Sequence, residues 1–158
     1  MKPFYWLLHL RPLLLVAIFP GLLLWLSHGH APTSVRDWHV LGLLLALAGL
    51  PLLAVAHWQV YRPGQWGTQA SPFDEPSRLE TGGAYRWLRH PQLLGIYLLL
   101  LGEALWFGSL WLAGYALVVI VASARVAVRA EEARLDAAFG TAHAQWAART
   151  RRFVPGLF

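Results

Sequence analysis

Apolar residues along the chain gather into stretches long enough to cross a membrane. The first two stretches run from about 4–26 and 40–61. Each is close to the ~20 apolar residues that a helix needs to span a bilayer. The first stretch is too long for the apolar part of a cleavable signal peptide, and no small-residue cleavage site precedes the next polar segment. Both stretches are therefore predicted to be transmembrane helices.

A third apolar region, 93–128, is too long for a single crossing. Gly108 and Ser109 lie near its middle and predict the tight turn of a helical hairpin. The two halves then give spans of about 91–107 and 109–128. The pattern predicts an all-α, polytopic membrane protein with four transmembrane helices.

Two polar regions complete the predicted organisation. The loop 62–90 is rich in proline and glycine, which argues against a long helix there. In the C-terminal segment 129–158, the helical pattern of the fourth span continues, so that 109–139 is predicted as one helix of ~46 Å that extends into the cytosol. Gly140 is a suitable C-terminal cap, and a short helix is expected at 141–149. All 158 residues are expected to form a single membrane domain.

Composition excludes several other classes of protein. The chain is 57% apolar and only 13% charged, against roughly a quarter charged in soluble domains, and its mean hydropathy is +0.46. The net charge of +5 favours a membrane surface over nucleic acid as partner, because the apolar excess is so large. With no cysteine, no paired histidines and no acidic cluster, no metal site is predicted.

Basic residues predict the orientation of the spans. Of the basic residues, only Arg36 lies on the membrane side opposite the 62–90 loop and the C-terminal segment. Because basic residues are enriched on the cytosolic side of membrane proteins, both termini are predicted to lie in the cytosol. Abundant leucine, alanine and arginine with a single lysine indicates a bacterium with a GC-rich genome, so the expected location is the bacterial inner membrane. The basic residues on the cytosolic side are Lys2, Arg11, Arg62, Arg78, Arg86, Arg89, Arg125, Arg129, Arg134, Arg149, Arg151 and Arg152.

Polar residues at the start of the third span are the first candidates for chemistry. Pro91 suits the first turn of a helix, and the free N–H groups of such a helix start bind carboxylate or phosphate. Arg89 and His90 directly precede it. The alternative is that Arg89 extends to the membrane surface while His90 caps the helix.

A second candidate group lies on the cytosolic extension of the fourth span. Glu131 is predicted on a more apolar side, where a carboxylate suggests a cationic partner. Only one of the two adjacent glutamates can point squarely into a common site, and the other is expected to orient Arg129 or Arg86. Glu132 shares a face, expected to be solvated, with the charged residues Arg125, Arg129 and Asp136.

An acidic residue also lies within the third span. Glu103 is a functional candidate because charged groups inside membranes are costly. Its place near the external end makes exposure at the interface, or a structural pair with Arg36, an equal alternative.

Taken together, these residues resemble the integral-membrane methyltransferases that include isoprenylcysteine carboxyl methyltransferase and phospholipid N-methyltransferases. The chain departs from the family pattern at Leu93 and His143, which replace tyrosines, and at Ala84, which replaces proline. The resemblance covers about 64–155. The positions that correspond to the family pattern, these three departures included, are Leu79, Gly83-Ala84-Tyr85, Arg89-His90-Pro91-Gln92-Leu93-Leu94-Gly95, Glu131-Glu132, Leu135, Phe139-Gly140, His143 and Trp146.

This resemblance implies S-adenosylmethionine as the cofactor. The ammonium of this cofactor would bind Glu131 or Glu132. Its carboxylate would bind the helix start at Pro91, together with His90 and Arg89. The implied catalytic residues are Arg89 and Glu132. The implied cofactor-binding residues are Tyr85, whose ring would contact the adenine, and His90, Pro91, Leu93, Gly95, Glu131 and Glu132.

The implied acceptor is lipophilic and enters from the bilayer, with a carboxylate, thiol or amine as the methylated group. An amine would require a general base, whereas a carboxylate would not. Two alternatives remain: an NADPH-dependent sterol-type membrane reductase, for which no additional basic cluster is visible, and a non-enzymatic four-helix membrane subunit.

Overall fold

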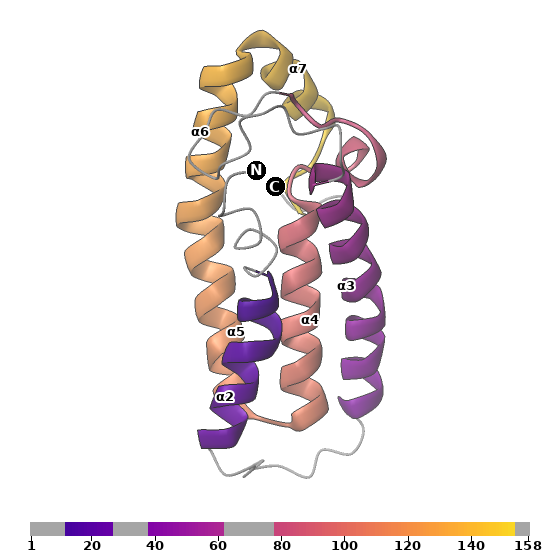
Figure 1. Ribbon diagram of the computed structural model, residues 1–158, viewed down its shortest axis with the longest axis vertical. Coiled ribbons are helices and arrows are strands. Elements are labelled where there is room, and N and C mark those ends of the chain that lie inside the picture. Colours follow the sequence, from indigo (N-terminus) through magenta and orange to yellow (C-terminus); the bar gives the residue numbers. More distant parts are fainter. Residues whose placement is uncertain (1–11, 27–37, 62–77, 154–158) are drawn as a thin grey trace, which may run out of the picture.

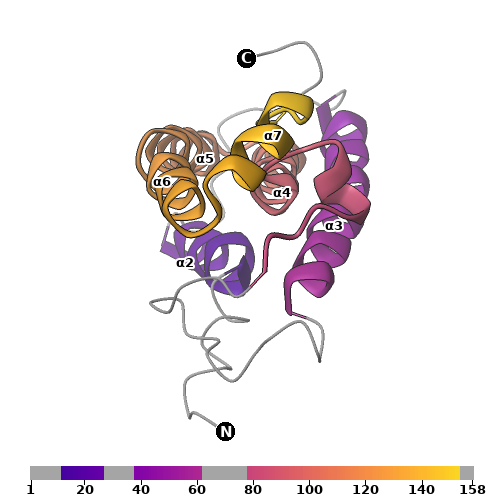
Figure 2. The ribbon, with the colours of Figure 1, turned by 90° about the horizontal axis from the view of Figure 1, so that it is seen from above.

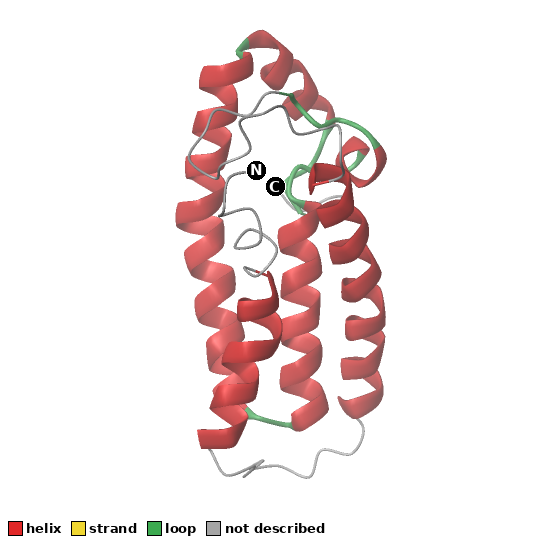
Figure 3. Cartoon of the chain, in the orientation of Figure 1, coloured by secondary structure: helices red, strands yellow, loops and turns green. Residues whose placement is uncertain are grey.

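The computed structural model describes residues 12–26, 38–61 and 78–153. The start of the first predicted span, most of the 62–90 loop, Arg36 and the last five residues lie outside these ranges. Within them, every regular element is a helix and none is a strand (Figure 3). The all-α prediction is confirmed for this part of the chain.

The second and third predicted spans become the helices α3 (Trp38–Tyr61) and α4 (Pro91–Phe107). They lie side by side (Figure 1). A Cβ atom on Gly95 would be 2.7 Å from the backbone nitrogen of Leu53, and one on Gly42 would be 2.7 Å from the carbonyl oxygen of Gly102. Glycine therefore allows the two helix backbones to approach closely, as is typical of membrane helices.

The predicted hairpin turn follows α4. Gly108 adopts the left-handed conformation (φ 58°, ψ 28°), which glycine tolerates without strain. Ser109 then caps α5 (Leu110–Ala122) because its hydroxyl accepts a hydrogen bond of 3.4 Å from the backbone N–H of Leu112. The predicted helix boundary at Gly108-Ser109 is confirmed.

A continuous helix runs from Leu110 to Phe139, as predicted. It contains a π-helical turn, η3 (Ser123–Ala127), between α5 and α6 (Val128–Phe139). The hydroxyl of Ser123 bonds back to the carbonyl of Val119 and contacts the Tyr97 hydroxyl at 2.6 Å. A side-chain hydroxyl that bonds to a backbone carbonyl in this way competes with the regular backbone hydrogen bonds of the helix. Gly140 (φ 49°) ends α6, and α7 (Thr141–Arg149) follows.

The first apolar stretch contains a π-helical turn, η1 (Leu14–Ile18), and α2 (Phe19–Leu26). In Figure 2, α4 lies between α3 and α5, and α7 crosses above α4. The buried core gathers on α4, whereas α3 and α5 expose large apolar side chains. The core cluster consists of Leu53, Ile96, Tyr97, Leu99, Leu100 and Ala116.

Two described helices are long and apolar enough to cross a membrane, Trp38–Val60 and Leu110–Phe139. The apolar helices Leu14–Leu26 and Pro91–Phe107 are shorter. The four-span topology therefore stays a prediction, while the helical fold and two candidate spans are established. The beginning of α4 lies toward the same end of the bundle as α6 and α7 (Figure 1).

Candidate functional site

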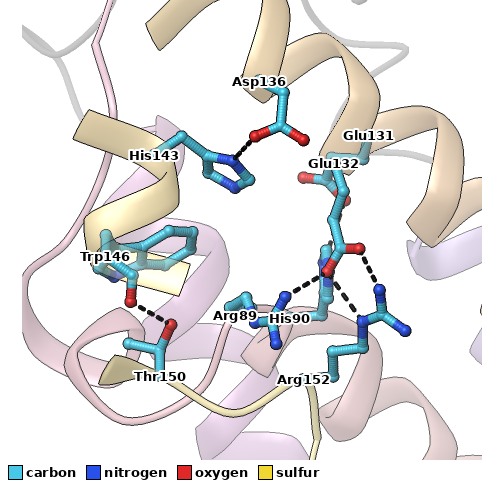
Figure 4. A network of polar contacts seen from close by, with 9 residues as sticks. All are labelled: Arg89, His90, Glu131, Glu132, Asp136, His143, Trp146, Thr150 and Arg152. Atoms are coloured by element: carbon cyan, nitrogen blue, oxygen red, sulfur yellow. Dashed lines mark hydrogen bonds and ion pairs between the residues drawn. The ribbon is translucent and has the colours of Figure 1, made fainter. Parts of the chain in front are cut away.

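The candidate site forms where the beginning of α4 faces α6. Pro91 is the first residue of α4, as predicted, and is almost fully buried. His90 is the N-cap residue of α4, as the alternative predicted, but its side chain makes no capping hydrogen bond. Its buried imidazole instead faces the carboxylates of α6 (Figure 4).

Glu132 is the centre of this polar network. Its Oε1 accepts hydrogen bonds from Arg89 Nη1 at 2.9 Å and Arg152 Nε at 3.0 Å, and its Oε2 accepts from Arg152 Nη2 at 2.6 Å. His90 Nε2 lies 3.4 Å from Oε1. Burial raises the pKa of this carboxyl, but the hydrogen bond and charge of Arg152, the charge of Arg89 and the contact with His90 outweigh it. The pKa of Glu132 is therefore lowered.

The structure reverses the predicted exposure of the two glutamates. The Glu132 side chain is 12% exposed, whereas that of Glu131 is 55% exposed and contacts His90 Nδ1 at 3.2 Å. The expectation that Glu132 lies on a solvated face is wrong, because the chain after α7 folds back over this face of α6. Its arginine partners are Arg89 and Arg152, in place of the expected Arg129 or Arg86.

The segment after α7 forms another wall of the site. It runs beside the residues before α4, with a parallel bridge between Leu88 and Arg151. The backbone N–H of Arg89 donates to the Arg151 carbonyl at 2.6 Å, and that of His90 donates to the Arg152 carbonyl at 3.2 Å. Sequence reasoning missed Arg151 and Arg152 because their only signal was clustered positive charge.

Phe153 extends this wall toward the core. Its ring centroid lies 5.9 Å from that of His90 and 5.4 Å from that of Tyr97. The Phe153 ring thus packs against the imidazole, both nitrogen atoms of which face carboxylates of α6.

Helix α7 adds a second acid–histidine pair. His143 Nδ1 lies 2.6 Å from Asp136 Oδ1, one turn of α6 beyond Glu132. The ring of His143 is 5.5 Å from that of Trp146, whose indole N–H donates to the Tyr85 carbonyl at 3.0 Å. Sequence analysis noted His143 only as a departure from the family pattern.

The remaining predicted site residues divide into two groups. Tyr85 is buried next to α7, beside the site. Leu93 packs against the core cluster, and Gly95 lies in the contact between α3 and α4. Helix packing thus accounts for Gly95 without a bound cofactor.

Glu103 lies far along α4 from the site. It is 13 residues from His90, which corresponds to ~20 Å along a helix. One of its carboxylate oxygens is buried without a hydrogen-bond partner among the described residues. Its expected partner, Arg36, falls outside the described ranges.

Two buried nitrogens at the site also lack partners in the described part of the chain. They are Arg89 Nε, a donor, and His143 Nε2. Buried polar groups are normally satisfied, so such atoms suit a polar ligand. A cationic donor beside a half-exposed carboxylate fits the carboxylate and ammonium of an amino-acid moiety. No cluster of three metal-ligating side chains occurs among the residues described.

Comparison with known proteins assigns the family. The family model for phospholipid methyltransferases matches residues 38–142, which contain α3 to α6 and the Arg89, His90, Glu131 and Glu132 positions. No curated protein and no solved structure gives a significant match. Methyltransferase activity on a membrane lipid is the function that this match indicates, and neither alternative function is favoured. Since the match covers well over half of the sequence, the chain belongs to the phospholipid methyltransferase family.

Proposed function

We propose that this protein transfers a methyl group from S-adenosylmethionine to a lipophilic acceptor held in the membrane. The observation that carries the proposal is the meeting of Arg89 and His90 with the Glu131–Glu132 pair, although Arg89 and Glu132 are 43 residues apart along the chain. In a family of methyltransferases, this polar cluster at the end of apolar helices is suited to join a charged cofactor to a membrane substrate.

Two residues are suited to hold the ends of the cofactor's amino-acid moiety. The half-exposed Glu131 would bind the ammonium, since Glu132 is already occupied by two arginines. Arg89 would bind the carboxylate through Nε, the donor that lacks a partner in the described chain. Glu132 holds the Arg89 guanidinium in position, and His90 does the same for Glu131.

The cofactor supplies a methyl group already activated by a sulfonium centre. The protein's contribution is then to orient the two reactants and to exclude water. Tyr85, buried beside Trp146, is the proposed contact for the adenine ring. Arg89 and Glu132 act through electrostatic positioning, without a covalent intermediate on the protein.

We further propose that the four apolar stretches all cross the bilayer, with the site at the cytosolic end. The cofactor then enters from the cytosol, and the acceptor enters from the lipid. A bacterial inner membrane is the proposed location. The acceptor's reactive group, a carboxylate, thiol or amine, is addressed in the next section.

Calorimetry of the purified protein in detergent tests the proposed function. S-adenosylhomocysteine, the product form of the cofactor, is expected to bind, and NADPH is not. Binding of NADPH without S-adenosylhomocysteine would favour the reductase alternative. Binding of neither would favour a non-enzymatic subunit.

A further inference from the structure

Asp136 and His143 form a pair that the proposed cofactor contacts leave unused. The Nδ1–Oδ1 distance is 2.6 Å, and the His143 side chain is 3% exposed. Because a carboxylate accepts hydrogen bonds, Nδ1 carries the proton in this contact. In the neutral imidazole with this tautomer, the lone pair is on Nε2, which is buried and has no hydrogen-bond partner among the described residues.

The other ionisable groups around His143 are engaged with one another. Glu132 on α6 binds Arg89 before α4 and Arg152 after α7. Both nitrogens of His90 face carboxylates, Nδ1 at Glu131 and Nε2 at Glu132. Figure 4 shows the His143 imidazole on α7 directed toward the side of the network where Trp146 and the Arg89–Glu132 pair lie. Of His90 and His143, His143 has a ring nitrogen, Nε2, without a partner among the described residues.

We propose that His143, oriented by Asp136, accepts the proton that an amine acceptor loses when it is methylated. This inference rests on the proposed function. The ammonium of the acceptor gives its proton to His143 Nε2 and keeps the electron pair. That pair forms the new N–CH3 bond while the C–S bond of the sulfonium donor breaks, with its electrons remaining on sulfur. Asp136 stabilises the imidazolium so formed.

A carboxylate acceptor carries no proton at neutral pH and therefore has no need of His143. Two single-chain probes with the same hydrocarbon tail separate these cases. Octadecylamine and stearic acid are each added to phosphatidylcholine vesicles that contain the full-length protein and radiolabelled S-adenosylmethionine. The wild type is expected to methylate the amine.

His143→Asn keeps a side-chain donor for Asp136 but removes the proton acceptor. It is expected to lower the turnover of octadecylamine by about 100-fold or more, with S-adenosylhomocysteine affinity changed less than about 3-fold. The wild-type rate should rise with pH as one group loses its proton, and in the variant this rise should be displaced to the higher pH at which the amine itself loses its proton. His39→Asn, at the opposite end of α3, is the matched control and should retain wild-type turnover.

Nitrogen NMR of the histidine rings provides a readout that does not depend on activity. The signals of His143, identified by their loss in His143→Asn, should show a proton on Nδ1 in the wild type. In Asp136→Asn, this tautomer should lose its preference. A wild-type proton on Nε2 would overturn the proposal.

Three further results would overturn the role of His143. They are unchanged turnover and pH dependence in His143→Asn, a loss of S-adenosylhomocysteine affinity as large as the loss of turnover, and a wild-type protein that binds S-adenosylhomocysteine but does not methylate the amine. A wild-type protein that fails to bind S-adenosylhomocysteine contradicts the proposed function itself. The binding measurement thus distinguishes the two failures.

Discussion

Glu132 and Arg152 meet through two parallel hydrogen bonds, of 3.0 Å and 2.6 Å, although they are 20 residues apart and belong to different segments. The planar guanidinium matches both oxygens of the carboxylate, which makes this a strong and directional contact. It fixes the segment after α7 against α6. The contact therefore holds together two walls of the candidate site.

This pair predicts a loss of stability in acid. The pKa of Glu132 is lowered from an ordinary 4.5, so its ion pairs stabilise the folded protein fully above pH 4.5 and are lost as the pH falls through the lower folded-state value. We expect the thermal unfolding temperature of the wild type in detergent to fall over this range. Glu132→Gln should be less stable above pH 4.5 and should show a smaller fall. Equal pH dependence in the two proteins would contradict this assignment.

Cofactor affinity should depend on both glutamates. Glu131→Gln removes the charge proposed to meet the cofactor ammonium, and Glu132→Gln releases Arg89. Losing one charge-assisted hydrogen bond costs about 1.5–3 kcal/mol, which is roughly 10- to 150-fold in affinity. Calorimetric titration with S-adenosylhomocysteine measures this loss. Glu103→Gln is the control and should bind as the wild type does; sensitivity only at Glu103 would place the site elsewhere.

The close contact between α3 and α4 predicts that a single added methyl group at Gly95 lowers the stability of the protein. In Gly95→Ala, the new Cβ would approach the backbone of Leu53 to 2.7 Å, and overpacking of this kind costs about 1–3 kcal/mol. Gly114→Ala on α5 adds a Cβ with no atom within 4 Å and should leave stability unchanged or raise it. Thermal unfolding of both variants in detergent compares them directly. Equal unfolding temperatures would mean that the helices do not pack as described.

Orientation in the membrane can be tested in bacterial cells. The distribution of basic residues predicts that both termini face the cytosol. A green fluorescent protein fused after Phe158 should fluoresce, whereas alkaline phosphatase fused there should be inactive. An active phosphatase fusion would contradict the predicted topology.

Local signals predicted the helix boundaries well. Pro91 and the Gly108-Ser109 pair gave the bounds of α4, because proline favours the first helical turn and glycine with serine ends one helix and caps the next. The π-helical turn at Ser123 was not predicted. It accompanies a contact with Tyr97 of another helix, and such contacts are not visible in a local pattern.

At the site as well, the sequence predicted the residues that belong to local motifs but not the contacts that depend on the folded chain. Motif order identified Arg89, His90 and the glutamate pair, and the structure brings all of them together. Helical spacing alone assigned Glu132 to a solvated face, since it carries no information on the later segment that covers this face. Arg152 and the Asp136–His143 pair depend on how the chain turns back after Gly140.

The parallel pairing of Leu88 with Arg151 sets an order of assembly during translation. Helices α3, α4 and α5 are synthesised before Arg151 and Arg152. The contacts of Glu132 and His90 with the segment after α7 can therefore form only after the apolar helices have been synthesised. A chain released just after α6 would carry those helices without a closed polar site. Enzymatic competence would then report on whether translation had continued past the final helix.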